Sequence, residues 1–226
     1  MKKIIVLFAI ACLGVITTQC KKDTQEVNLH TDYFDLTQGR FIVYDVMEIS
    51  HSQGAAGSDT SIYQLKTVIG DTVTDNAGRI VRKFYRYTRD SATGVWDLKD
   101  VWTTIIADYR AELVEENQRV VKLVFAPTLE KNWDANAYNQ FPKLDCYYDE
   151  IHKSYTVGAN QFDSTITVEQ ADELNLIQYK RKYEVYAKGI GLVKTHFRDL
   201  EINNFDVTDI NEGKELFMNF VSAGFE

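Results

Sequence analysis

The fold is decided by the stretch Ile177-Gln178-Tyr179-Lys180-Arg181-Lys182-Tyr183-Glu184-Val185-Tyr186-Ala187-Lys188. Most of its apolar and aromatic side chains fall on one face, namely Ile177, Tyr179, Tyr183, Val185 and Ala187. The polar positions Gln178, Lys180, Lys182, Glu184 and Lys188 share the other face. A period of two is that of a β-strand, whose successive side chains point to opposite faces. The pattern predicts a half-buried strand with its charged face in solvent.

The same alternation recurs along the rest of the chain. It covers residues 41–49, 62–69, 80–87, 95–106, 121–125, 162–168, 192–202 and 216–221. Tyr, Phe, Val, Ile and Thr dominate these runs, and such residues pack well on pleated surfaces. The sequence therefore predicts roughly nine to eleven strands.

Turn signals separate the runs. They lie at residues 74–78, 90–94, 115–118, 157–160 and 211–213, and each suits a short hairpin. Helix is expected only as one short turn near residues 168–174 beyond the N-terminal signal. Strands joined by hairpins predict an all-β antiparallel meander, which must form a curved sheet, a half-barrel or a barrel to protect its edges.

The N-terminus has the composition of an export signal. Met1-Lys2-Lys3 is basic, and the 13 residues 4–16 are apolar or small. As a helix this run is about 20 Å long, whereas a hydrocarbon core is about 30 Å thick. A buried core helix would instead show polar positions every third or fourth residue. Residues 1–19 are therefore expected to be a signal peptide.

Cys20 follows the signal at the position where signal peptidase II would cut and a diacylglyceryl group would attach. Thr17 and Gln19 depart from the usual lipobox, so cleavage to a soluble periplasmic product is the alternative. Residues 21–26 are polar, as a membrane tether requires. We expect a palmitate-bearing lipoprotein of the outer membrane, on its periplasmic side or at the cell surface. Residues 20–32 would be the tether, and 33–226 a single β-rich domain.

Charge and cysteine content restrict the partners. Loss of Lys2 and Lys3 takes the net charge from −8 to about −10. A domain with this net negative charge is not expected to bind nucleic acid. Cys12 leaves with the signal and Cys20 is the lipid site, so Cys146 alone remains in the domain and is expected to be buried as a small hydrophobe.

Catalytic motifs are absent from the sequence. It contains four histidines but no HExxH, G-x-S-x-G, P-loop or G-x-G-x-x-G pattern. Asp145, Asp149, Glu150 and His152 are metal-ligand types, yet their spacing matches no zinc or calcium site, so a solvated strand end is favoured. No metal and no cofactor are expected. The 33 acidic residues leave a catalytic carboxylate pair open as an alternative.

Three tryptophans are candidate ligand-binding residues. Trp96, Trp102 and Trp133 could each stack against a sugar or another ligand if exposed. For Trp133, between Pro127 and Pro142, plugging the end of a curved sheet is the simpler role.

Three further stretches carry a family resemblance. They are YFDLTQGRFIVYDV at 33–46, WDANAYN at 133–139 and VYAKGIGLVK at 185–194. They resemble the signatures of an uncharacterised Bacteroidota-type family of β-rich lipoproteins, which read Y-F-P-L-x-x-G-x-x-W-x-Y-x-V, W-D-G-N and Y-A-K-G-V-G-L-V. Asp35, Ile42 and Ala135 replace the usual Pro, Trp and Gly. The resemblance implies a β-rich lipoprotein domain and supplies no catalytic residue.

The resemblance to these exported proteins also suggests O-glycosylation at three positions. Thr72, Ser91 and Ser164 each follow an aspartate and precede a small or apolar residue or Thr, which matches the acceptor that such proteins use for O-glycosylation. Asp-Ser and Asp-Thr pairs also suit turns, which is the alternative explanation.

Together these features favour a non-enzymatic envelope protein. We expect a curved sheet that binds a ligand or a partner protein. The alternatives are a hydrolase of glycans or envelope polymers that uses a carboxylate pair, and a structural or assembly lipoprotein.

Overall fold

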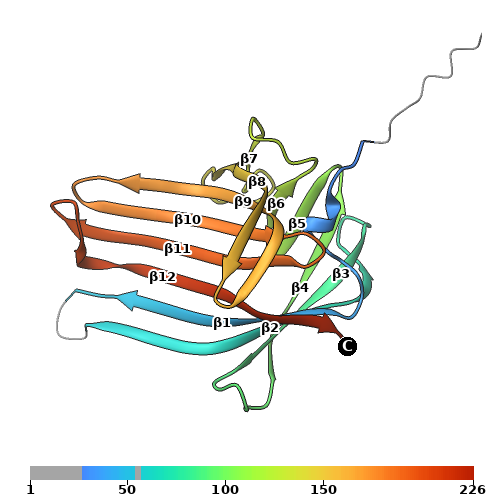
Figure 1. Ribbon diagram of the computed structural model, residues 1–226, viewed down its shortest axis with the longest axis horizontal. Coiled ribbons are helices and arrows are strands. Elements are labelled where there is room, and N and C mark those ends of the chain that lie inside the picture. Colours follow the sequence, from blue (N-terminus) through green and yellow to red (C-terminus); the bar gives the residue numbers. More distant parts are fainter. Residues whose placement is uncertain (1–26, 54–56) are drawn as a thin grey trace, which may run out of the picture.

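A computed structural model of the protein describes residues 27–53 and 57–226 and shows an all-β chain (Figure 1). Twelve antiparallel strands form one sheet in the order β6-β5-β4-β3-β2-β1-β12-β11-β10-β9-β8-β7. Neighbours in the sheet are neighbours along the chain, except where β1 pairs with β12. The predicted antiparallel meander is confirmed. Within the described ranges, no helix is long and apolar enough to cross a membrane.

The elements have the following bounds. They are η1 (Thr31–Tyr33), β1 (Arg40–His51), β2 (Ser58–Thr74), β3 (Ile80–Arg89), β4 (Asp97–Ala107), β5 (Arg110–Glu115), β6 (Gln118–Val124), β7 (Asn132–Asp134), β8 (Asp145–Val157), β9 (Asn160–Leu174), β10 (Gln178–Ala187), β11 (Gly191–Asn203) and β12 (Asp206–Phe225).

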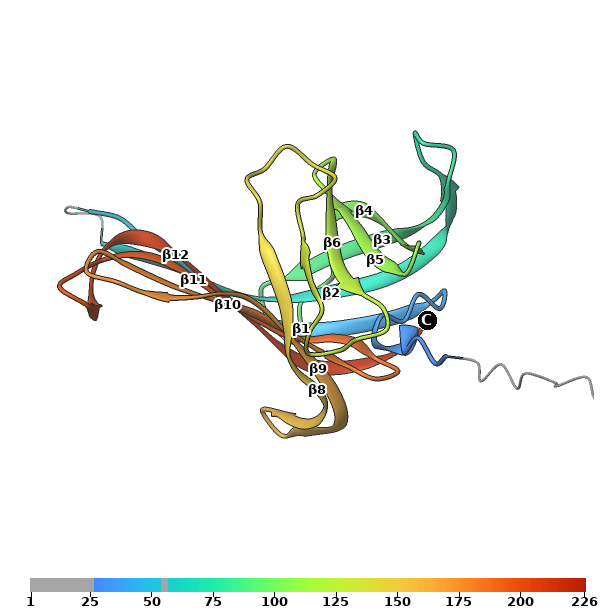
Figure 2. The same cartoon turned by 90° about the horizontal axis from the view of Figure 1, so that it is seen from above.

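The sheet has two parts. At one end it curls until β6 lies across from β7 and β8, which gives a nearly closed barrel (Figure 2). At the other end β1, β2 and β9 to β12 continue past the barrel as a single layer, which we call the wing. Long strands make the wing possible, since β2 has 17 residues and β12 has 20.

The seam between β6 and the β7–β8 hairpin is closed largely by side chains. The Val121 N–H donates to the Ala135 carbonyl (2.9 Å), and the Trp133 indole donates to the Val121 carbonyl (3.1 Å). The Tyr148 hydroxyl donates to the Val124 carbonyl (2.8 Å) and accepts from the Val124 N–H (3.0 Å). One tyrosine thereby satisfies backbone groups that a further strand would otherwise pair.

Replacing Tyr148 by phenylalanine is expected to lower stability by about 1–3 kcal/mol, because the N–H and C=O of Val124 lose their partner. The melting temperature should fall by roughly 2–4 °C for each kcal/mol. Tyr147→Phe is the control, since Tyr147 is the adjacent residue and is 44% exposed. Equal melting temperatures for the two variants would contradict this account of the seam.

The segment around η1 plugs the barrel end where β1 begins. Tyr33 is fully buried, and its hydroxyl lies 2.7 Å from both His152 Nδ1 and Ser164 Oγ. The chain also finishes here, since the Glu226 N–H donates to the Gly39 carbonyl (2.9 Å). Both ends of the described chain therefore lie at the plugged end, remote from the wing (Figure 1).

Two local predictions were wrong. Residues 168–174 are not a helical turn but the end of β9, because they pair with β10. Residues 211–213 are not a hairpin turn, since they lie within β12; the turn is at Asn204-Phe205, where both φ angles are positive. Gly213 instead allows two strands to pack closely. A Cβ there would lie 2.3 Å from the Asp199 carbonyl oxygen, so only glycine permits β11 and β12 to approach so closely.

Cys146 is buried as predicted, with 1% of its surface exposed. Burial raises the pKa of its thiol to about 12, so the thiol stays protonated at neutral pH.

Candidate functional site

The barrel encloses a cavity of about 240 Å³. One end is covered by Phe34 and Leu36, which follow η1. Apolar side chains from five strands form most of the wall, including Ile42, Leu65, Ile69, Leu113, Leu192 and Met218. The end opposite η1 is bordered by the partly exposed Arg86, Trp102 and Leu216.

A buried ion pair lies in this apolar wall. The Lys122 ammonium donates to Glu184 Oε1 (2.6 Å), and their side chains are 14% and 9% exposed. The Tyr186 hydroxyl donates to Glu184 Oε2 (2.6 Å), so both oxygens of this carboxylate are held. Burial alone would lower the pKa of Lys122, but attraction by Glu184 outweighs it and the pKa is raised. Lys122 is therefore charged at neutral pH.

The buried position of Glu184 corrects the sequence analysis. The face of β10 predicted to be in solvent carries Glu184 into the cavity, together with the fully buried Tyr186. The opposite face is also covered, because Val185 packs in a cluster with Val157 and Phe162 of the β8–β9 hairpin. Alternation separates two faces but does not say what covers each. The aromatic Tyr186 on the polar face was the signal that this face is not simply solvated.

Two polar groups of the cavity lack a partner. Thr195 is only 9% exposed, and its hydroxyl forms no hydrogen bond to any described residue. Glu115, at the end of β5, forms no hydrogen bond or ion pair within residues 27–53 and 57–226. Buried polar groups are normally satisfied, so the Thr195 hydroxyl is a candidate for contact with a ligand. Glu115 is a second candidate, as a partly exposed carboxylate of the cavity wall without an ion pair. Neither residue was predicted from the sequence.

Of the three tryptophans, Trp102 borders the cavity. The Arg86 guanidinium lies 3.8 Å from the centroid of its ring and pairs with Asp100 (2.7 Å). The Trp102 indole donates to Glu116 Oε1 (3.1 Å). Arg86 and Glu116 thus hold the ring at the edge of the cavity.

The other two tryptophans lie elsewhere. Trp96 precedes β4 and lies beneath Arg89 and Lys66, with 4.2 and 5.4 Å to its ring centroid. Trp133 packs against Tyr148 with ring centroids 4.9 Å apart and belongs to the seam. Neither contributes to the cavity wall.

The proposed modification sites differ in access. Thr72 and Ser91 are exposed, in β2 and in the β3–β4 turn. Ser164 is partly buried with its hydroxyl against Tyr33. The lipidation candidate Cys20 lies outside the described residues.

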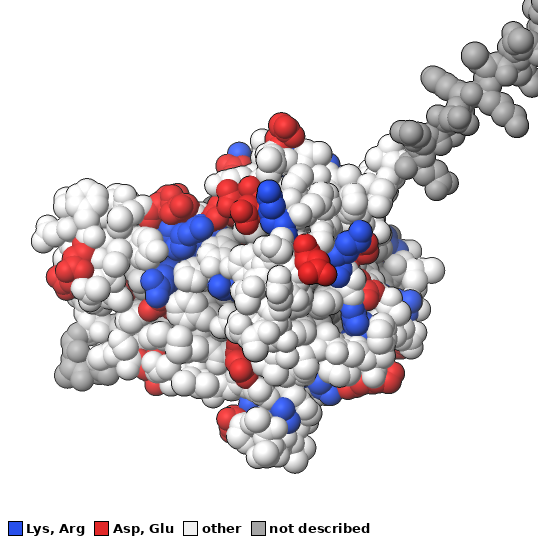
Figure 3. Space-filling view, in the orientation of Figure 1, with Lys and Arg blue, Asp and Glu red and all other residues white. Residues whose placement is uncertain are grey.

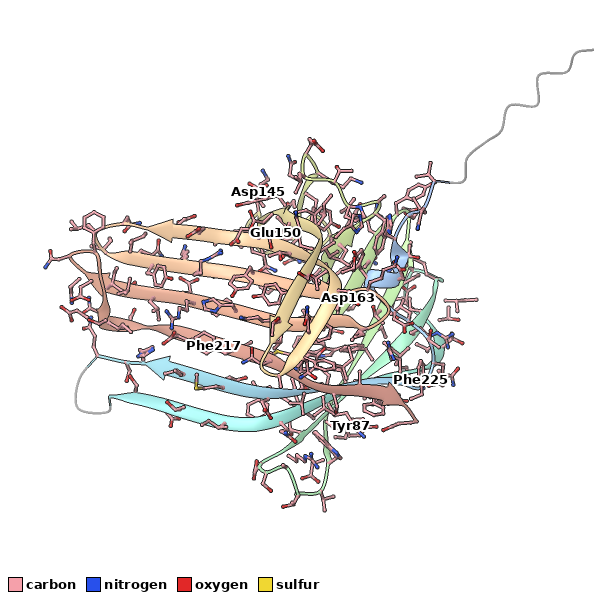
Figure 4. All side chains as sticks on the ribbon, viewed as in Figure 1. Tyr87, Asp145, Glu150, Asp163, Phe217 and Phe225 are labelled. Atoms are coloured by element: carbon pink, nitrogen blue, oxygen red, sulfur yellow. The ribbon has the colours of Figure 1, made fainter. Side chains whose placement is uncertain are left out.

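The acidic stretch of β8 is a solvent-facing strand. Asp145 and Glu150 are both exposed (Figure 4), and Asp145 pairs with Lys143 (2.8 Å). In the part of the chain that the structure describes, no three His, Cys, Asp or Glu side chains are placed to hold a metal ion.

A second polar cluster lies on the outer face of the sheet. The rings of Tyr183 and His196 are parallel with centroids 4.9 Å apart, and Phe217 meets His196 edge-on at 5.0 Å. Arg181 pairs with Glu169, and Arg198 with Glu215. Basic and acidic side chains consequently alternate over this part of the face (Figure 3).

The position of His196 predicts an acid sensitivity. Burial, with repulsion from Arg198, Lys194 and Arg181, lowers its pKa from 6.5 to about 4. Between pH 6.5 and 4 the unfolded chain binds this proton and the native protein does not, so stability falls as pH falls. We expect a loss of roughly 1–2 kcal/mol, less than the full shift implies because the ring is partly exposed.

Urea unfolding at several pH values measures this effect. His196→Phe keeps an aromatic ring and removes the titration, so its stability should fall less between pH 6.5 and 4. Parallel pH profiles for the variant and the wild type would contradict the assignment to His196.

Comparison with known proteins gives one distant structural similarity. No protein-family model and no curated protein sequence match the chain. A crystal structure of a candidate lipoprotein from Parabacteroides distasonis is similar over 85% of this chain and 98% of its own, with 13% identity and a TM-score of 0.41. A similarity of this extent supports no conclusion about function.

Proposed function

We propose that the protein is an exported, lipid-anchored binding module whose barrel interior holds a small, mostly apolar ligand. The cavity carries this proposal, because an apolar wall encloses a few fixed polar groups, which is the usual composition of a small-molecule site. The unpartnered hydroxyl of Thr195 gives the ligand a polar contact that the protein itself leaves unused.

Hydrolysis fits the cavity less well than binding. A glycosidase needs two carboxylates about 5–10 Å apart, one of which donates a proton. Glu115 and Glu184 share the cavity, but Lys122 and Tyr186 hold both oxygens of Glu184. A carboxylate fixed in this way is poorly placed to donate a proton or to attack a substrate.

Thermal unfolding with n-octanol, a neutral amphiphile, tests the cavity. The alcohol should raise the melting temperature of the wild type, because a ligand of the native state stabilises it. Met218→Trp should remove the shift, since the indole fills the cavity beside Leu216. Met47→Trp is the control and should keep the shift. Met47 is 36% exposed and does not line the cavity, whereas Met218 does. No shift in the wild type would overturn the binding proposal and favour the structural role.

Thr195→Val adds a sharper test. Removing an unsatisfied buried hydroxyl should stabilise the ligand-free protein by about 1 kcal/mol. The same change should weaken n-octanol binding, since the ligand hydroxyl loses its partner. A variant that is more stable and binds as well as the wild type would remove Thr195 from the site.

Export and anchoring require separate tests. The basic start and apolar run of residues 1–16 support export, and the polar residues 21–26 support a tether. Labelled palmitate should be incorporated into the wild type in its host but not into Cys20→Ala. The variant should also move from the membrane fraction to the soluble fraction. Retention of Cys20→Ala in membranes would contradict lipidation of this residue.

A further inference from the structure

Three cations and three carboxylates line the cavity, and five of these six groups are paired. Arg40 pairs with Asp35 (3.2 Å) and Lys122 with Glu184 (2.6 Å). Arg86 pairs with Asp100 (2.7 Å), which lies outside the lining. Glu115 is the carboxylate left over, with no cation within 4 Å among the described residues. The lining therefore offers one carboxylate without an ion pair.

The topology places this carboxylate near the opening and near the buried pair. Thr103 of β4 pairs with Val114 of β5, so the next residues along the two strands, Trp102 and Glu115, border the cavity together. The charge of Glu115 also contributes to raising the pKa of both Lys122 and Tyr186, which places it within their electrostatic reach.

Lys122 lies within electrostatic reach of Glu115, but its direct contact is with Glu184. Thr195 is the direct cross-strand partner of Glu184, so its free hydroxyl lies beside the same pair. The lining therefore offers a ligand head two unpaired oxygen acceptors, the Glu115 carboxylate and the Thr195 hydroxyl. An ammonium group supplies both N–H donors and the cation that Glu115 lacks in direct contact.

We propose that the ligand of the barrel cavity is an amphiphile with one positive charge, an aliphatic primary amine or a molecule ending in one, and that Glu115 binds its ammonium group. This inference rests on the proposed function, since it requires the cavity to be the binding site. The apolar wall receives the aliphatic chain, while Glu115 and Thr195 receive the head.

Three probes of equal chain length separate the possibilities. The probes are n-octylamine, n-octanol and n-octanoate, titrated at pH 7 by calorimetry into the full protein. We expect the amine to bind at least about tenfold more tightly than the alcohol and the carboxylate to bind most weakly. Equal binding of amine and alcohol would show that Glu115 does not recognise the ammonium group and would overturn this inference while leaving the cavity proposal standing. Tighter binding of octanoate would also overturn it, and no binding of any probe would overturn the proposed function.

Glu115→Gln tests the residue itself. Glu115 has no described partner to lose, so this variant should fold as the wild type does, which its melting temperature checks. Its preference for amine over alcohol should fall to within about threefold, with alcohol binding unchanged. Glu150→Gln, which removes one exposed carboxylate on β8, should keep the wild-type preference. An undiminished preference in Glu115→Gln would exclude Glu115 as the recognition group.

Discussion

Lys122→Met should destabilise the protein by about 3–5 kcal/mol, because it leaves the Glu184 carboxylate buried without its cation. Methionine fills a similar volume, so the loss is electrostatic rather than a packing defect. Chemical denaturation should show a lower midpoint with an unchanged slope, and the melting temperature should fall by roughly 2–4 °C per kcal/mol.

Two further variants test whether the uncompensated charge of Glu184 causes this loss of stability. In Lys122→Met/Glu184→Gln the residual charge is removed and the amide can still accept from Tyr186, so most of the stability should return. Lys83→Met breaks the Lys83–Asp71 pair (3.1 Å), whose carboxylate side chain is 56% exposed, and should cost no more than about 1 kcal/mol. A double variant as unstable as Lys122→Met would show that the uncompensated charge is not the cause.

Glu112→Gln is expected to cost about 2–4 kcal/mol. The Glu112 side chain is fully buried on β5 and is the common partner of Arg79 (2.9 Å), Arg110 (3.3 Å) and Arg119 (3.7 Å). The ring of Tyr138 lies under two of these guanidinium groups, 5.0 and 5.8 Å from its centroid. A neutral amide in place of the carboxylate removes the counterion that the three arginines share, while Arg79 keeps Asp75 and Arg110 keeps the exposed Asp108.

Asp108→Asn is the matched control for Glu112→Gln. Asp108 also pairs with Arg110 (3.2 Å), but its side chain is 81% exposed. Its loss should change stability by less than about 0.5 kcal/mol. If the two variants unfold at the same urea concentration, the three arginine pairs of the buried Glu112 do not stabilise the barrel.

Most of the strands and hairpins could be predicted from the sequence because their signals are local, although β5 and β8 were not predicted. Period-two runs and turns such as residues 74–78 and 90–94 depend on a few neighbouring residues. The turn predicted at residues 211–213 was wrong because glycine occurs both in turns and where strands pack closely. Only the position of β11 shows that Gly213 belongs to the second case. The three-residue strand β7 is too short to show any period.

The candidate site could not be predicted in the same way. Lys122 and Glu184 come together from β6 and β10, and no spacing along the chain relates them. Of the proposed binding residues only Trp102 borders the cavity, whereas Glu115 and Thr195 look like ordinary strand residues. These two residues stand out only because they lack hydrogen-bond or ion-pair partners, and this can be seen only once the barrel has folded.

The plugged end also determines which way the molecule would face. The described chain enters beside η1, at the end of the barrel opposite the wing (Figure 1). If Cys20 carries the proposed lipid, the tether joins the domain at this plugged end, so the wing is the part of the domain farthest from the point of attachment.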